Sequence, residues 1–366
     1  MLTVNPPSGD DKNMSKRKQK GDTVKQFIIK HISDHSGDIA RFVCEKFDIS
    51  RQAANRHLRQ LVSDGALIAT GSTRNRRYSL APLVEKIEHF PIVSTLQEDK
   101  VWRERVEPLL TGVPENVLDI CHYGFTEIFN NVIEHSEGSN VSIGINYTPA
   151  MIEIDVRDDG VGVFNKITKA LRLDDERHAI LELAKGKLTT QPETHTGEGI
   201  FFSSRMFDNF SMLSGRLFFQ HDEPGDDWLL EDHEEKNKGT FVAMKISPHS
   251  KRTSREVFDK HGTIENPLSF SSTHVPVLLA QYGDENLVSR SQARRLLARF
   301  ERFEEVFLDF KGVRTVGPAF VDEIFRVFRN HNPRTRILWI RANKAVENMI
   351  KRVATDDQGQ LPLISD

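Results

Sequence analysis

The first part of the chain alternates between helical and strand-like spacing of its apolar residues. A first helix is predicted from apolar positions at helical spacing, namely Val24, Phe27, Ile28 and Ile32. A second short helix follows over residues 37–47. A third is predicted between Ser50, which suits an N-cap, and Gly65, which suits a helix end. Residues 66–80 then read as two strands around an Arg-rich turn, so residues 21–84 are expected to form one small domain.

A second pattern covers residues 90–250 and mixes helices with strands. The predicted elements, in order, are helical sequence at 100–136, strands at 139–147 and 151–158, a short helix within the polar stretch 164–198, a helix from Gly199, and strands near 210–220 and 239–247. This mixture predicts an α/β domain.

Strands and helices alternate in a third region, residues 252–366. Strands are predicted at 271–280, 304–310 and 334–342, and helices at 289–303, 317–331 and 344–354. Such alternation predicts a small sheet with helices packed on it. The expected fold class is therefore a multidomain α/β protein.

Composition narrows the class of protein. The 366 residues are 28% charged and 38% hydrophobic, which is typical of a soluble protein with several domains. Cys44 and Cys121 lie far apart, which indicates a reducing compartment and argues against a disulfide scaffold or a zinc cluster. No apolar run reaches the roughly 18 residues of a membrane span, and the N-terminus has no signal-peptide core. We therefore expect a cytoplasmic location and no membrane partner.

Charge is distributed unevenly along the chain. Residues 12–86 hold 16 Lys and Arg against 7 Asp and Glu, a net charge of +9, whereas residues 87–366 hold 34 against 44, a net charge of −10. Residues 1–20 show no apolar periodicity and are expected to be a disordered basic arm. The basic front favours a polyanionic partner, although a basic solubilising segment would have the same composition.

The predicted helix that ends near residue 136 carries an unusual polar stripe. Glu127, Asn131 and His135 share one face, each four residues from the next, opposite the apolar face. Two adjacent asparagines are poor helix formers, which suggests that one face of the helix belongs to a ligand. A solvated polar stripe would also account for these three residues by themselves.

Three glycine-containing motifs follow this helix. Asp158, Gly160 and Gly162 form a D-x-G-x-G pattern at the end of a predicted strand. Gly197 and Gly199 precede a predicted helix, where unpaired backbone amides favour phosphate. The third motif, Gly239–Thr240, opens the last strand of the region.

In this order and on these elements, the motifs resemble the ATP-binding domain that histidine kinases share with gyrase, the Hsp90 chaperone and the anti-sigma-factor serine kinases. The resemblance covers about residues 100–248. It implies a Bergerat-type α/β sandwich that holds ATP between helices and a mixed sheet.

The resemblance also implies roles for individual residues. Asn131 would bind Mg²⁺, Glu127 would orient or activate the attacking group, and His135 would lie near the phosphates. Asp158 would bind the adenine amino group, with Thr240 close by. The glycines would contact the base or the phosphates: Gly160, Gly162, Gly197 and Gly199. The stretch between the glycine motifs would form a lid, from which Lys185 or Lys187 could reach phosphate.

The type of chemistry stays open. No H-E/D-x-R-x-P phosphoacceptor motif is present, which argues against a histidine autokinase. The chain resembles the anti-sigma serine kinase branch more closely. An ATPase, a serine/threonine kinase acting on a partner protein, and a sensor that only binds nucleotide all remain compatible with these motifs.

The first domain resembles a winged helix-turn-helix. Its third predicted helix and its Arg-rich turn offer outward side chains suited to base edges and phosphates: Arg51, Gln52, Asn55, Arg56, Arg59, Arg74, Arg76 and Arg77. DNA is the expected partner. The alternative is a basic module that binds protein.

Residues 266–356 are similar to STAS-type domains, the fold of anti-anti-sigma factors. Those factors carry a phosphorylatable Ser or Thr where a helix begins. Gly317, Pro318 and Ala319 occupy that region here, with Thr315 as the nearest hydroxyl. Phosphorylation of this domain by its own ATP module is therefore not expected.

Together these features predict a DNA-binding transcriptional regulator whose activity is controlled by Mg-ATP binding or hydrolysis. The predicted domains are a basic arm at 1–20, the winged helix at 21–84, the ATP-binding domain at 90–250 and a STAS-like domain at 252–366. Two alternatives stay open, namely an anti-sigma-type kinase and an ATP-driven interaction protein that does not bind DNA. A protein partner or a homodimer would contact the ATP-binding and STAS-like domains.

Overall fold

The computed structural model describes most of the chain in two compact units. The described residues are 21–32, 34–72, 75–188, 197–222, 226–231, 237–261, 270–281 and 286–354. The first unit contains Met1–Ile87 together with Gly144–Glu153 and Ser247–His249, and the second contains the rest. The predicted basic arm, residues 1–20, lies outside the described residues.

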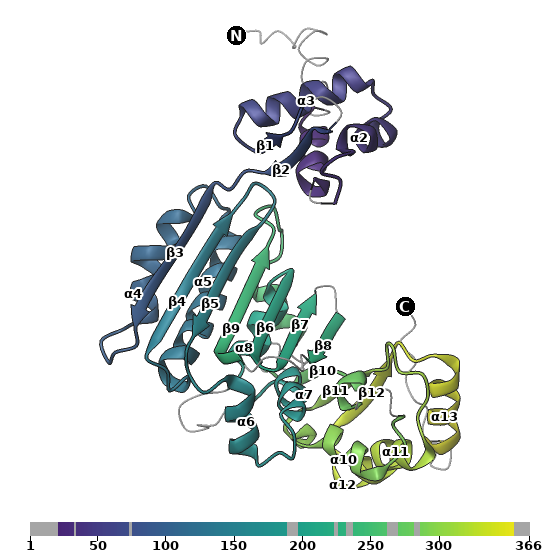
Figure 1. Ribbon diagram of the computed structural model, residues 1–366. Helices are drawn as coiled ribbons and strands as arrows, with labels where there is room; N and C mark the ends of the chain where they lie inside the picture. Colours follow the sequence, from purple (N-terminus) through teal and green to yellow (C-terminus); the bar gives the residue numbers. More distant parts are fainter. Residues whose placement is uncertain are drawn as a thin grey trace, which may run out of the picture. The chain divides into compact units, whose positions relative to one another are not determined.

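The N-terminal part of the first unit has the elements that the apolar pattern predicts. A helix over residues 21–31 is followed by α2 (Ile39–Phe47), α3 (Arg51–Ser63), β1 (Leu67–Thr70) and β2 (Arg77–Leu80). The two strands pair antiparallel (Figure 1). Ser50 caps α3 by accepting a hydrogen bond of 3.2 Å from the Ala53 amide. Whether this arrangement is a winged helix-turn-helix stays a prediction.

One apolar cluster holds these helices and strands together. Each helix contributes its inward stripe, and strands β1 and β2 contribute Leu67 and Tyr78. The buried helical members are Val24, Ile28, Ile32, Ile39, Val43, Ala54, Leu58 and Leu61. Their burial turns the opposite, polar face of α3 toward solvent.

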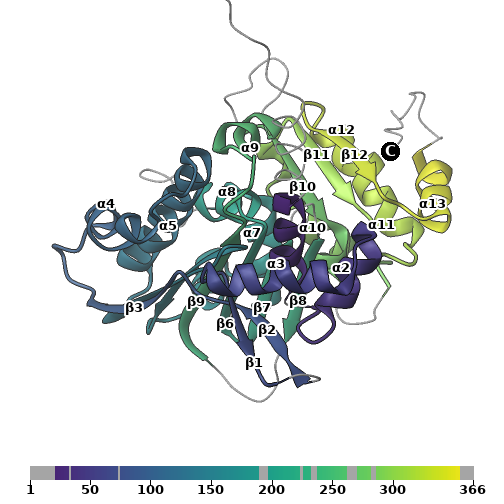
Figure 2. The ribbon, with the colours of Figure 1, turned by 90° about the horizontal axis from the view of Figure 1, so that it is seen from above.

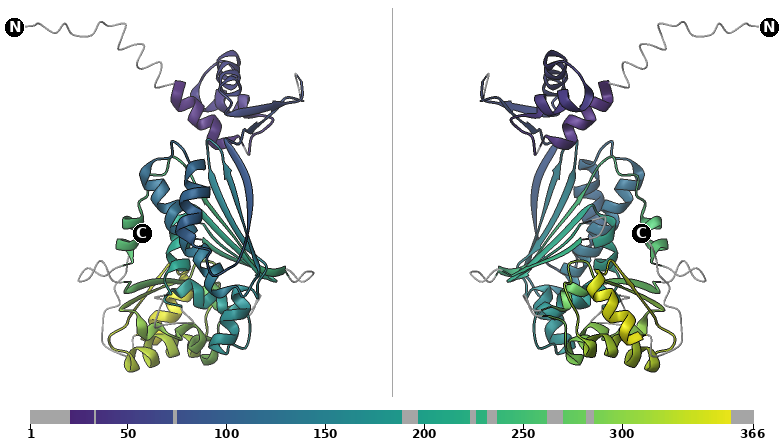
Figure 3. Two further views of the ribbon diagram at one scale, coloured as in Figure 1. Left: turned by 90° about the vertical axis from the view of Figure 1, so that its left-hand side faces the viewer. Right: turned by 90° about the vertical axis from the view of Figure 1, so that its right-hand side faces the viewer.

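A seven-stranded sheet with strand order β3-β4-β5-β9-β6-β7-β8 forms the middle of the chain. Its strands are β3 (Val84–Pro91), β4 (Asn140–Tyr147), β5 (Ile152–Asp158), β6 (Asn209–Gly215), β7 (Leu217–Asp222), β8 (Asp226–Glu231) and β9 (Asn237–Ile246). Along β5 every second residue is buried, as expected for a strand with one covered face. Figures 1 and 3 show the helices α5 (Glu115–His135) and α8 (Gly199–Met206) on that face.

Smaller helices surround this sheet. They are α4 (Glu98–Val101), the π-helical η2 (Trp102–Val106), the 3-10 helix η3 (Glu107–Leu109), α6 (Val163–Leu171), α7 (Arg177–Lys185) and α9 (Ser254–Lys260). The short helix predicted in the polar stretch is confirmed as α7. Helices α6 and α9 and strands β3 and β8 were not predicted, and both of these strands lie at the edges of the sheet.

The C-terminal domain, defined here as described residues 270–354, has a parallel sheet of order β10-β11-β12. Its strands are β10 (Ser272–Pro276), β11 (Glu305–Asp309) and β12 (Arg336–Ile340). The helices are η4 (Val277–Ala280), α10 (Arg290–Leu297), η5 (Phe300–Arg302), α11 (Pro318–Asp322), η6 (Glu323–Phe328), α12 (Arg329–His331) and α13 (Lys344–Ala354). The helix predicted over 289–303 is broken, because Arg299 has a left-handed backbone with φ of +68°.

Candidate functional site

Helix α5 supplies one wall of a cavity of about 380 Å³ in the middle domain. Its apolar face is buried through Ile128, Phe129 and Val132. The polar stripe of the same helix is half-buried and lines the cavity through Glu127, Asn131 and His135. Asn130 lines the cavity as well. The stripe therefore faces a hollow of a size that an organic ligand could fill.

Asp158 stands at the end of β5 and is 5% exposed. Its carboxylate accepts hydrogen bonds from the Gly160 amide at 2.8 Å and from the Thr240 amide at 3.2 Å. Burial raises the pKa of Asp158 above its ordinary value, while these two amides act in the opposite direction. A buried carboxylate at a cavity wall can accept a hydrogen bond from a ligand amino group, which is the role the resemblance implies.

The glycines of the D-x-G-x-G motif permit close packing around Asp158. A Cβ atom at Gly160 would lie 2.0 Å from the Ser136 carbonyl oxygen, so any side chain there would displace backbone. Gly162 has φ of +84°, which other residues rarely adopt. Directly after it, the Val163 amide donates to the Thr240 hydroxyl at 3.0 Å, which brings β9 and the start of α6 together.

The second glycine pair places the N-terminus of α8 against Glu127. A Cβ atom at Gly199 would lie 1.9 Å from Glu127 Oε2. Only glycine therefore lets this carboxylate approach the first turn of α8. The positive end of the helix dipole favours negative charge at that point, whether a carboxylate or a phosphate.

The cavity includes most of the residues predicted for a nucleotide. Those that line it are Glu127, Asn131, His135, Asp158, Gly162, Gly197, Gly199 and Thr240. Gly160 supports Asp158 from behind without lining the cavity. Lys185 and Lys187 do not line it in this structure either, and their side chains contact the C-terminal domain.

Further residues of the cavity were not predicted from the sequence. Tyr123 lines it one turn before Glu127, and burial followed by the charges of Glu127 and Glu198 raises the pKa of the tyrosine. Lys166 on α6 donates to the His135 carbonyl oxygen at 2.7 Å and to Glu137 Oε1 at 3.0 Å. The four-residue spacing from Tyr123 to Glu127 could have placed the tyrosine on the same helical face. The position of Lys166 beside the cavity depends on how α6 packs.

The residues predicted for DNA contacts lie on α3 and between or on strands β1 and β2. Arg51, Gln52, Arg56 and Arg59 are exposed, while Asn55 is half-buried. Arg76 and Arg77 are exposed as well, and Arg76 lies over the Tyr78 ring at 5.6 Å. Arg74 lies outside the described residues. DNA binding by this surface stays a prediction.

Two protein families match parts of the chain. Residues 94–216 match the family described as a histidine kinase-like ATPase domain. Residues 292–347 match a STAS-like domain of unknown function. The chain carries a histidine kinase-like ATPase domain and a STAS-like domain. The predicted resemblances to these two domains are thereby confirmed, and neither match includes residues 21–84, for which a winged helix-turn-helix was predicted.

The ATPase domain implies ATP binding, and the cavity lies between its α5, β5 and α8. No curated protein matches the chain. None of the helices in the described part of the chain has both the length and the apolar character needed to cross a membrane.

Proposed function

We propose that this protein is an ATP-dependent regulator that binds Mg-ATP in the cavity of its ATPase domain and DNA through its N-terminal unit. The observation that carries the proposal is the convergence of Glu127, Asn131, Asp158 and Thr240, drawn from three separate elements, on one cavity at the N-terminus of α8. A cytoplasmic location is part of the proposal, in keeping with two cysteines that are both unbridged.

Each end of the cavity suits a different part of ATP. Asp158 and Thr240 offer a buried carboxylate and a hydroxyl for the adenine amino group and a bound water. The first turn of α8 and His135 lie where phosphates would be favoured. The nucleotide would thus have its base toward β5 and its phosphates between α5 and α8.

Magnesium would enter with the nucleotide rather than occupy a site of its own. The described residues contain no group of three or more His, Cys, Asp or Glu that could hold a metal ion. Asn131 offers one amide oxygen, which fits an ion that keeps most of its waters and takes phosphate oxygens as ligands. When bound, the metal would neutralise phosphate charge.

Glu127 is the residue proposed to orient or activate the attacking group. Its carboxylate lies against the first turn of α8, within the same cavity as Asn131. A carboxylate so placed can accept a proton from a water or from a hydroxyl of a partner protein. If water attacks the phosphate, the protein is an ATPase. If the hydroxyl of a partner protein attacks, the protein is a serine/threonine kinase.

Labelled ATP separates these activities. Label transferred to a partner protein supports the kinase, released phosphate supports the ATPase, and tight binding without either supports a sensor. Titration calorimetry with Mg²⁺ and ATP tests the shared requirement. No heat of binding for ATP or ADP would refute the nucleotide function.

DNA binding is proposed from the exposed cations of α3 and the wing, within a segment whose net charge is +9. Contacts to phosphates release counterions, so the logarithm of the binding constant should fall steeply with the logarithm of salt concentration. A binding constant that hardly changes with salt would favour a module that binds protein instead.

A further inference from the structure

Helix α7 has two faces with different neighbours. Leu183 lines the nucleotide cavity, and Leu188 just beyond the helix does so too. Glu182 and Lys185 point instead to the C-terminal, STAS-like domain. Figures 1 and 2 show α7 beside β10 of that domain, which it contacts. The helix is therefore a wall shared by the cavity and the STAS-like domain.

A buried ionic cluster joins α7 to the end of α10. Lys185 is fully buried and donates to Glu182 Oε1 at 2.6 Å and to the carbonyl oxygens of Arg295 and Ala298 at 3.1 Å and 3.0 Å. These bonds use all three ammonium hydrogens, which leaves none for a phosphate. Arg299 Nε lies 3.0 Å from Glu182 Oε2. Burial lowers the pKa of Lys185 to about 8, against the attraction of Glu182.

The backbone at the end of α7 is held as firmly as its side chains. The last carbonyl groups of a helix have no partner within the helix. Here the carbonyl oxygen of Lys185 accepts from the Thr273 hydroxyl at 2.7 Å, and that of Gly186 accepts from Arg299 Nη2 at 2.8 Å. The carbonyl of Lys187 accepts from Arg302 Nη1 at 3.4 Å. Three consecutive carbonyls of this wall thus depend on donors from the STAS-like domain.

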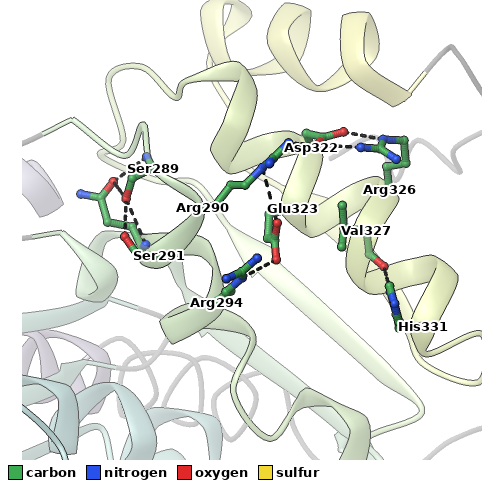
Figure 4. A network of polar contacts seen from close by, with 10 residues as sticks. Ser289, Arg290, Ser291, Arg294, Asp322, Glu323, Arg326, Val327 and His331 are labelled. Carbon is green, nitrogen blue, oxygen red and sulfur yellow. Dashed lines mark hydrogen bonds and ion pairs between the residues drawn. The ribbon is translucent and has the colours of Figure 1, made fainter.

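The arginines of α10 and the loop after it separate into two groups. Figure 4 shows Arg290 and Arg294 directed to the domain's own acidic residues, at 3.2 Å from Asp322 and 2.7 Å from Glu323. Arg299 belongs to the other group, which faces α7. It keeps a backbone with φ of +68°, a position after a helix that glycine would occupy without strain. An arginine at such a position costs backbone energy, and its contacts with α7 offset that cost.

We propose that Arg299 is a positioning residue for the nucleotide site. Together with Thr273 it holds α7 in place as a cavity wall, so docking of the STAS-like domain supports nucleotide binding. The inference rests on the proposed nucleotide function of the cavity. Because coupling between two sites is reciprocal, bound nucleotide should in turn strengthen the contact between α7 and the STAS-like domain.

The test uses the full chain with Mg²⁺ and adenylyl imidodiphosphate, an ATP analogue that is not hydrolysed. Arg299→Gly removes the contacts with α7 while it relieves the left-handed backbone, so loss of folding is not expected to mask the result. We expect its affinity for the analogue, measured by calorimetry, to fall about fivefold or more, the lower end of typical coupling. Thr273→Val, which removes one hydroxyl, should weaken binding in the same direction.

Arg290→Ala is the matched control. It removes an arginine at the start of α10, the helix that precedes Arg299, but Asp322 keeps Arg326 and Glu323 keeps Arg294 as partners. Its nucleotide affinity should equal that of the parent. Hydrogen exchange adds a readout that loss of stability would not produce. The analogue should slow exchange at the end of α10 in the parent, and this protection should be lost in Arg299→Gly.

The outcomes separate the two proposals. Equal or tighter nucleotide binding by Arg299→Gly, with normal binding by the parent, overturns the role of Arg299 and leaves the nucleotide function intact. A parent and variants that all fail to bind nucleotide refute both. Weaker binding in Arg299→Gly together with an unchanged Arg290→Ala supports the positioning role.

Discussion

The amide of Thr240 donates a hydrogen bond of 3.2 Å to the carboxylate of Asp158, across 82 residues of sequence. This bond joins β9 to the end of β5 at the wall of the cavity. It orients the carboxylate for a ligand, because one oxygen is held by Thr240 and the other by the Gly160 amide. The carboxylate proposed to bind the base is therefore held in place by two backbone amides of the protein itself.

Replacement of Asp158 should abolish recognition of the adenine amino group. In Asp158→Asn the side-chain NH₂ group replaces one carboxylate oxygen. It then faces a backbone N–H donor, and two donors cannot form a hydrogen bond with each other. We expect at least a tenfold weaker binding of ATP by calorimetry. Asp159→Asn is the control, since Asp159 bonds to the amides of Ser139 and Asn140 and does not line the cavity. Equal binding by parent and Asp158→Asn would contradict the assignment.

Removal of the Asn131 amide should erase the benefit of magnesium. We expect Asn131→Ala to bind ATP with nearly the same affinity with and without Mg²⁺, whereas the parent should bind about tenfold tighter with the metal. Calorimetry in Mg²⁺ and in a chelator measures both. If Asn131→Ala gains as much from Mg²⁺ as the parent does, this residue is not a metal ligand.

Gly199→Ala should displace the carboxylate of Glu127, although the two residues are far apart in the sequence. The new Cβ would lie 1.9 Å from Glu127 Oε2, and the carboxylate is the flexible partner that must turn away. We expect ATP binding to persist while turnover, measured as phosphate release or transfer of label, falls about 100-fold, as for loss of a general base.

Glu127→Gln should reproduce this behaviour without the steric change. Gly37→Ala is the neutral control, because a Cβ atom there meets nothing within 4 Å. Turnover in Gly199→Ala at the parent's level would show that Glu127 is not needed where the structure has it.

Single arginine changes on α3 should reduce the salt dependence of DNA binding. Loss of one phosphate contact in Arg56→Ala or Arg59→Ala should lower the slope of log affinity against log salt by about 1. Fluorescence anisotropy with duplex DNA over a range of salt measures the slope. Arg41→Ala is the control, since Arg41 is exposed on α2 and pairs with Asp38. A slope that is unaltered in both α3 variants would argue against phosphate contacts there.

Acid should destabilise the second unit through His261. This residue is 6% exposed among Phe201, Phe202 and Phe270, and burial followed by the charge of Arg205 lowers its pKa to about 3. Below pH 6.5 the unfolded chain takes up a proton that the folded chain does not. The free energy of unfolding should therefore fall by at most about 1.4 kcal/mol per pH unit between 6.5 and 3.

Denaturant unfolding at pH 7.5, 6 and 5 measures that slope. His261→Phe keeps an aromatic ring in the same cluster and should show a smaller dependence of the unfolding free energy on pH. His249 is exposed, so His249→Gln should keep the parent's dependence. An equal acid slope in the parent and in His261→Phe would exclude this histidine as the cause.

Several features could be predicted from the sequence because they depend on local spacing. Glu127, Asn131 and His135 share a helical face since they are four residues apart, and this holds wherever the helix packs. The D-x-G-x-G turn after β5 likewise follows from its own residues. Helix α6 was not predicted, and with it Lys166, although Phe164, Ile167 and Leu171 lie at helical spacing.

The sequence by itself determined the ATPase and STAS-like domains and the stripe of α5, because repeating spacings and short motifs act between near neighbours. Only the tertiary structure decided which groups the ammonium of Lys185 contacts. The residue types around it permit a phosphate contact, yet its ammonium group bonds to the carbonyl of Ala298, 113 residues away. Contacts at such separations depend on how domains pack, and burial in that packing rather than local pattern directs the lysine away from the cavity.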